Sequence, residues 1–92
     1  MTATLQMLYD RLNRAEKYRE VFKGELGEWV LADIGRNCFM TRPTFVAGDP
    51  HQTSLNEGSR RAYLAILSQL SKVNRDRIIK QLNEIHPNSP QP

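Results

Sequence analysis

Apolar residues recur at three- and four-residue steps along most of this chain, which is the spacing of an α-helix. The pattern stops between residues 39 and 52, where Pro43 and Pro50 forbid a continuous helix. We therefore predict an all-α fold, a small bundle of three to four helices with one long irregular loop at about 39–52. The expected helices are residues 4–23, about 27–38, a third from Thr53 or Ser54, and a fourth from Ser71 or Asn74 to about Ile85.

The first predicted helix carries one apolar stripe, interrupted once by Arg19. Its members are Leu5, Leu8, Leu12, Ala15 and Phe22. Two interpretations are open: the stripe packs inside the domain, or it pairs with another copy of the chain. Packing inside the domain is favoured, because fewer than three full heptads are present. Gly24 suits the residue that ends this helix.

Small residues predict a close crossing between the second and third helices. Gly27 and Gly35 share roughly the face on which apolar residues recur every four positions, at Leu26, Val30, Ile34 and Cys38. Each helical glycine costs about 1 kcal/mol relative to alanine, which is tolerated where another backbone passes close. The third helix offers a matching patch of small residues, Gly58, Ser59 and Ala62. We expect the two helices to cross at these positions.

Local signals place the loop and the start of the third helix. Ser54 and Glu57 have the spacing of a capping box, in which each side chain satisfies a free backbone N–H of the other. Gly48-Asp49-Pro50 predicts a turn just before it. Phe45 and Val46 are expected to pin the loop onto the core.

Four residues outside the predicted core faces are candidates for binding a partner, namely Trp29, Arg60, Arg61 and Leu64. Trp29 falls away from the apolar stripe of its helix, so it is either covered by a loop or is an interface anchor. The other three share the outer face of the third helix. That face is either a solvated charged surface or a surface for a partner.

The fourth predicted helix is the most basic part of the chain. Its cations are Lys72, Arg75, Arg77 and Lys80. Phosphate contacts by such residues would give salt-dependent binding to DNA without sequence preference. The net charge of +3, with 13 basic against 10 acidic residues, is small for a nucleic-acid module, so DNA is a weaker alternative.

Little in the chain suggests catalysis or ligand chemistry. Its 92 residues predict one domain, residues 1–86, followed by a proline-rich tail, 87–92. The single cysteine, Cys38, excludes an internal disulfide, and the histidines His51 and His86 lack the spacing of a metal site. No nucleotide-binding motif or membrane-length apolar run is present. We expect no enzymatic activity, no cofactor, no metal and no membrane partner.

Two segments, "YREVFKGELGEWVLADIGRNCFM" and "GDPHQTSLNEGSRRAYLAIL", resemble the Bbp19-like domain of tailed bacteriophages over about residues 18–70. The first segment matches at Val21-Phe22, Gly27, Val30-Leu31, Asp33-Ile34 and Cys38-Phe39. The second matches at Asp49-Pro50-His51, Glu57-Gly58, Arg60-Arg61 and Ile66-Leu67. Ser59 departs from the family pattern, because it lengthens the spacing from glycine to arginine by one residue.

The resemblance implies a phage protein from a family with no assigned enzymatic activity. We expect a non-enzymatic protein that binds other phage proteins, or itself as a homo-oligomer, as a small virion component or assembly factor. Two alternatives remain: an early protein that inhibits a host complex by occupying a binding surface, and a DNA-contacting protein in packaging or ejection. The expected location is the cytoplasm of the infected host and, for a virion component, the particle.

Overall fold

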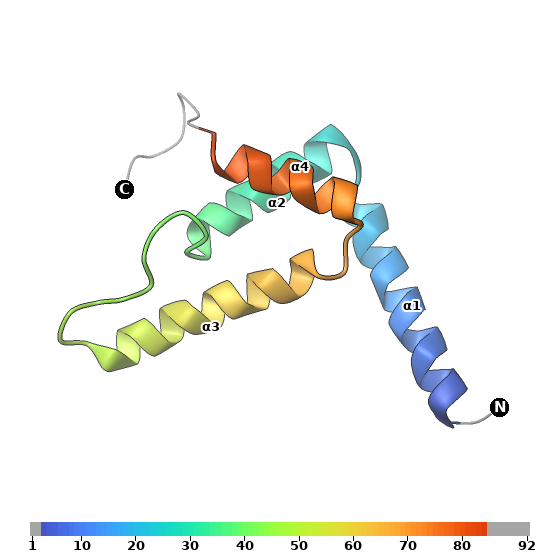
Figure 1. Ribbon diagram of the computed structural model, residues 1–92, viewed down its shortest axis with the longest axis horizontal. Coiled ribbons are helices and arrows are strands. Elements are labelled where there is room, and N and C mark those ends of the chain that lie inside the picture. The colour runs from blue at the N-terminus through green and yellow to red at the C-terminus, as the bar shows by residue number, and fades with distance from the viewer. Residues whose placement is uncertain (1–2, 85–92) are drawn as a thin grey trace.

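The computed structural model describes residues 3–84, which form four helices and no strand, so the all-α prediction is confirmed. The helices are α1 (Ala3–Phe22), α2 (Gly24–Asn37), α3 (Pro50–Leu67) and α4 (Lys72–Leu82). Helices α2 and α4 lie side by side and run in the same direction, while α3 runs back in the opposite direction (Figure 1). Helix α1 projects away from the other three. None of the four is long and apolar enough to cross a bilayer.

The helix ends follow local chemistry, and one of them differs from the prediction. Gly24, the second residue after the end of α1 and the first of α2, has a positive φ of 79°, as expected for a glycine that ends a helix. Helix α3 begins at Pro50, and Asp49 caps it by accepting a hydrogen bond from the Gln52 backbone N–H at 3.0 Å. The predicted capping box at Ser54 is therefore wrong. Proline breaks a helix interior but suits the first turn, where its missing N–H has no helical partner to lose.

The last helix starts where the sequence indicated. Ser71 caps α4, accepting a hydrogen bond from the Asn74 backbone N–H at 3.2 Å. The helix ends at Leu82, while the predicted end at Ile85 and the tail, 87–92, lie outside the described residues. The loop between α2 and α3 is shorter than predicted, because Pro50, His51 and Gln52 are helical.

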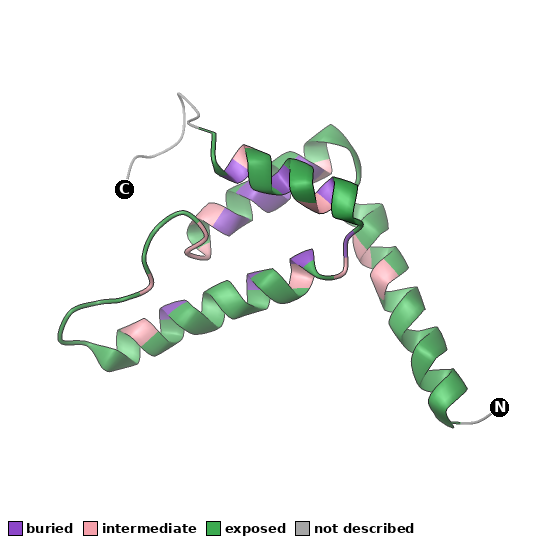
Figure 2. Ribbon diagram, in the orientation of Figure 1, coloured by how far each residue is buried: buried purple, intermediate pink, exposed green. Residues whose placement is uncertain are grey.

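The hydrophobic core is small and lies between α2, α4 and the C-terminal half of α3 (Figure 2). It consists of seven buried apolar residues, Leu31, Ala32, Tyr63, Leu67, Leu70, Ile78 and Leu82. Tyr63 joins two of the helices directly, because its hydroxyl donates a hydrogen bond to the Leu31 carbonyl at 2.7 Å. The buried hydroxyl is thereby satisfied, as buried polar groups generally are.

A buried carboxylate fixes how α2 pairs with α4. Glu28, only 5% exposed, accepts hydrogen bonds from the Asn74 side-chain amide at 2.6 Å and from Arg77 Nε at 2.8 Å. The same amide of Asn74 donates to the Phe22 carbonyl at 3.2 Å, which ties the end of α1 to the pair. Near the other end of α2, Arg36 donates to the Gln81 carbonyl at 3.0 Å. These contacts at both ends of α2 fix its axial alignment against α4.

The buried face of α2 is not the one that the apolar spacing predicted. The buried residues are Glu28, Leu31, Ala32 and Gly35. Leu26, Val30 and Ile34 are instead exposed, by 77%, 37% and 38% respectively. The inward position of Glu28 explains the difference, because a carboxylate tolerates burial when charged and polar partners meet it. Because Asn74 and Arg77 hold Glu28 on the inner side, the more apolar stripe of α2 faces solvent.

The predicted crossing of α2 and α3 at small residues is wrong, although Gly27 and Gly35 are both closely packed by other groups. A Cβ at Gly35 would lie 2.6 Å from the Tyr63 ring and 2.8 Å from Leu82, and a Cβ at Gly27 would lie 2.8 Å from the Phe22 backbone. The expected patch of small residues on α3 takes no part. Gly58 faces open space, and Ser59 and Ala62 are exposed.

Helix α1 contributes little to the core, so the prediction that its whole stripe packs inside the domain is wrong. No α1 residue is buried, and only Tyr18 and Phe22 pack against the core. Leu8 and Leu12 are 50% and 61% exposed. The radius of gyration is 15.9 Å, whereas a compact domain of this length has about 12 Å. A single copy of the chain is therefore extended and flat, with principal extents of 51 × 33 × 15 Å.

Two glycines in helix interiors should respond oppositely to alanine. Gly58→Ala meets open space, so it should stabilise the protein by about 0.5–1 kcal/mol through the higher helix propensity of alanine. Gly35→Ala forces the buried Tyr63 ring to move, so it should destabilise despite the same gain in propensity. Urea unfolding followed by circular dichroism measures both variants. Equal effects would contradict the close packing at Gly35.

Removing the amide of Asn74 should destabilise the pairing of α2 with α4. Asn74→Ala leaves the buried Glu28 carboxylate with one partner fewer, at a cost of about 2 kcal/mol. Asp76→Ala on the same helix is the matched control, because it removes only the exposed ion pair with Lys72. The urea midpoint should fall for the first variant and stay near wild type for the second. Similar midpoints for the two variants would show that the buried network does not hold the fold.

Candidate partner-binding surface

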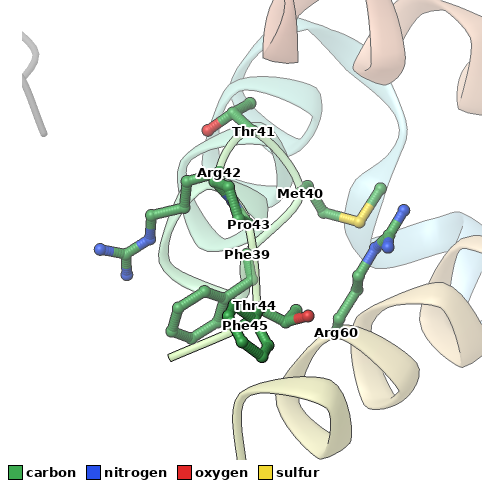
Figure 3. Close-up of a pocket in the computed structure, with 8 residues that line it drawn as sticks. All are labelled: Phe39, Met40, Thr41, Arg42, Pro43, Thr44, Phe45 and Arg60. Atoms are coloured by element: carbon green, nitrogen blue, oxygen red, sulfur yellow. The ribbon is translucent and has the colours of Figure 1, made fainter. Parts of the chain in front are cut away.

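An open recess of about 460 Å³ lies between the loop after α2 and the outer side of α3. It is lined by Phe39, Met40, Thr41, Arg42, Pro43, Thr44, Phe45 and Arg60 (Figure 3). Arg60 rises from α3, while the other seven residues are consecutive in the loop. The two arginines lie on opposite sides of the recess with their guanidinium groups pointing apart, and the rings of Phe39 and Phe45 lie near the Arg42 side (Figure 3). A guanidinium beside an aromatic ring suits a partner segment with a carboxylate beside an apolar side chain.

Hydrogen bonds to the first turns of α3 hold the loop in place. The Asn56 side chain is buried and donates to the Thr44 carbonyl at 3.0 Å. Thr44 in turn donates its hydroxyl to the Glu57 carboxylate. Thr53 accepts a hydrogen bond from the Val46 backbone N–H at 2.9 Å. The wall of the recess is therefore anchored on α3 by polar contacts.

Phe45 does not anchor this loop to the core, contrary to the prediction from the sequence. It is 72% exposed, and its neighbour Val46 is 37% exposed. Met40, at the other end of the loop, is the apolar side chain that packs against the core. The exposed ring of Phe45 is free to form part of the recess instead.

Phe39 holds an unusual backbone conformation at the edge of the recess. Its φ is 63°, in the left-handed region where glycine normally ends a helix. The Met40 N–H closes this turn by donating to the Gly35 carbonyl at 3.1 Å. The Arg42 guanidinium lies 4.3 Å from the centre of the Phe39 ring, a cation–π contact. A non-glycine residue here costs roughly 1–2 kcal/mol, and it places an aromatic ring at the recess.

The four residues predicted to bind a partner do not form one cluster. Arg60 lines the recess, while Arg61 and Leu64 are exposed farther along α3. Trp29 lies on α2 and is 49% exposed, so the loop does not cover it completely. Phe39, Arg42 and Phe45 join Arg60. The length of the loop at 39–52 is typical of a segment that binds a partner, but the sequence did not single out these three residues, because their placement depends on how the loop folds back on α3.

The cations of α4 are partly engaged within the chain. Arg77 pairs with the buried Glu28, and Lys72 pairs with Asp76 at 2.7 Å. Arg75 is half-buried, whereas Lys80 is exposed. Ion pairing of this kind competes with phosphate contacts, so α4 offers a weaker basic surface than its sequence suggests.

Tyr63 is the titratable group whose protonation the fold changes most clearly. Burial, and to a lesser extent the nearby Cys38, raises the pKa of Tyr63 from 10.0 to about 12, while Arg36 acts in the opposite direction. Among residues 3–84, no three acidic, cysteine or histidine side chains converge in a way that could hold a metal ion.

The comparison with protein families assigns the chain to a family. The family model described as Bbp19-like phage protein matches residues 18–84. The chain belongs to the Bbp19-like phage protein family. The match begins at Tyr18, which is also where α1 first packs against the core. Residues 3–17, which contribute no buried side chain, precede the matched region.

Searches of curated proteins and of solved structures find no match for this Bbp19-like chain. The family match extends the resemblance seen in the sequence through α4, to residue 84. It therefore covers the loop recess and the buried network at Glu28 as well as the core.

The raised pKa of Tyr63 predicts a loss of stability at high pH. The folded state prefers the neutral phenol, so this contribution is complete below pH 10 and is lost as the pH rises through 12. Wild-type protein should lose more stability between pH 9 and pH 12 than Tyr63→Phe, which has no phenol to ionise. Urea unfolding at several pH values measures the difference. Parallel losses in the two proteins would contradict a buried, neutral Tyr63.

Proposed function

We propose that this phage protein acts by protein–protein binding, as a small component of a tailed-phage virion or as an assembly factor. The observation that carries the proposal is the recess beside Arg60 of α3, where an anchored loop presents two aromatic rings and one further arginine, Arg42. Aromatic and arginine side chains are the residues most enriched at the energetic centres of protein interfaces.

The chemistry of the recess favours an acidic partner segment. Arg60 and Arg42 supply positive charge at its rim, and Phe39 and Phe45 supply apolar area. A carboxylate beside an apolar side chain would satisfy both. The partner is another phage protein of the head or tail, a role that is consistent with the family of the chain.

The first test is the content of phage particles. Purified, nuclease-treated particles are digested, and the copy number of this chain relative to the major capsid protein is determined by mass spectrometry. A fixed copy number supports a virion component. If the chain is abundant in infected cells and absent from particles, the virion role is wrong, and pull-downs decide between an assembly factor and an inhibitor of a host complex.

Arg60→Ala should weaken docking at the recess by about tenfold, on the order of 1.4 kcal/mol, because it removes the cation contributed by α3. Arg61→Ala is the matched control, since it removes the same charge from the next residue, which does not line the recess. A phage that lacks the gene is complemented with each variant, and incorporation or co-purification is quantified. Equal losses for the two variants would contradict docking at the recess and would favour a general effect of charge, as DNA binding predicts.

A further inference from the structure

Two apolar surfaces remain exposed in a single copy of the chain. We call residues 3–17 of α1 the arm, and Leu26, Val30 and Ile34 the outer face of α2. Leu8 and Leu12 on the arm are 50% and 61% exposed. The arm extends away from the core and α2 lies within the domain, so one copy's arm lies apart from its own α2 outer face (Figures 1 and 2).

Helix α2 is apolar on opposite sides. Its inner face packs Leu31 and Ala32 into the core with zero exposure. Its outer face repeats every four residues, so its three side chains form one continuous stripe. A helix that is apolar on both sides is normally buried on both sides. We therefore expect a further helix or segment to cover the outer face of α2.

The arm matches α2, the helix that carries this outer face, in length and in the spacing of its apolar residues. Its 15 residues span about 22 Å, and the 14 residues of α2 span about 21 Å. Leu8, Leu12 and Ala15 recur at helical steps along it, as the apolar residues of α2 do. Two helices of similar length can pack ridges into grooves along their apolar stripes.

The charges of the two helices are complementary. The arm carries three basic and two acidic residues, Arg11, Arg14, Lys17, Asp10 and Glu16. Helix α2 carries three acidic residues and one basic residue, Glu25, Glu28, Asp33 and Arg36. Even with Glu28 neutralised by Arg77, the acids of α2 outnumber its bases. A contact between two α2 helices would bring like charges together, whereas contact with the arm does not.

Pairing of two arms as a coiled coil accounts for fewer of these observations than docking of the arm on α2 does. Arg19 occupies the same heptad position as Leu12, so a parallel pair would bring two arginines together at the seam. An antiparallel pair that aligns Leu8 with Leu12 would place Arg11 of one arm beside Arg11 of the other. Either pairing would also leave the outer face of α2 exposed.

We propose that the arm of one copy docks on the outer face of α2 in a second copy. A reciprocal dimer or a closed ring of this contact uses every arm and every outer face once. The contact adds burial to a core that is thin in a single copy. It is separate from the recess at Arg60, so failure of either proposal leaves the other intact.

Site-specific disulfides test which surfaces meet. In full-length chains carrying Cys38→Ala, one population receives Leu8→Cys and the other Val30→Cys, and the two are oxidised separately and as a mixture. The proposal predicts cross-linked dimers mainly in the mixture. Cross-linking within the Leu8→Cys population alone would show that arms pair with each other, and cross-linking within the Val30→Cys population alone would show that α2 pairs with α2. Either result overturns the proposal.

Sedimentation equilibrium provides a second measurement that does not depend on disulfide geometry. Wild-type protein should exceed the monomer mass, and Leu8→Glu and Val30→Glu should each weaken association at least about tenfold. Val73→Glu on α4 is the matched control, because Val73 is 63% exposed and lies on neither surface. Circular dichroism checks that each variant is folded. A monomeric wild type, or dissociation by the arm variant alone, contradicts the proposal.

Discussion

The buried carboxylate of Glu28 determines how the rest of this structure is arranged. Its hydrogen bonds to Asn74 and Arg77 set α2 against α4, and the bond from Asn74 to the Phe22 carbonyl fixes where α1 leaves the domain. Removing one partner from a buried charge is costly, so the network admits few alternative registers. Because this carboxylate faces inward, the apolar stripe of α2 faces outward, and the surface available to a partner follows from an internal electrostatic contact.

A small core and large exposed apolar surfaces fit a protein that works in an assembly. Among residues 3–84, seven apolar residues are buried in a single copy, whereas the arm and the outer face of α2 expose leucines, a valine and an isoleucine. Contiguous exposed apolar surface generally marks an interaction site. The recess at Arg60 adds a second surface of different character, polar and aromatic, on another part of the Bbp19-like domain. The two proposals thus assign separate surfaces to a copy of the chain and to another phage protein.

The sequence predicts the helices well and their contacts poorly. The helical period and the glycine at position 24 depend on neighbours a few residues away, so both could be predicted. The buried face of α2 could not, because the partners of Glu28 lie 46 and 49 residues along the chain. The grouping of the loop residues with Arg60 could not be predicted for a similar reason. It depends on Asn56 holding the loop and on Phe39 adopting a conformation that favours glycine.

Hydrogen–deuterium exchange of the full-length chain, at a concentration where it is monomeric, tests the central claim most directly. That claim is that the folded unit of one copy begins at Tyr18 and that residues 3–17 depend on a second copy. Amides of α2 and α4 should exchange slowly, whereas those of residues 3–17 should exchange almost without protection. Protection of residues 3–17 equal to that of α2 in the monomer would contradict this account, because it would show that the arm packs against its own domain.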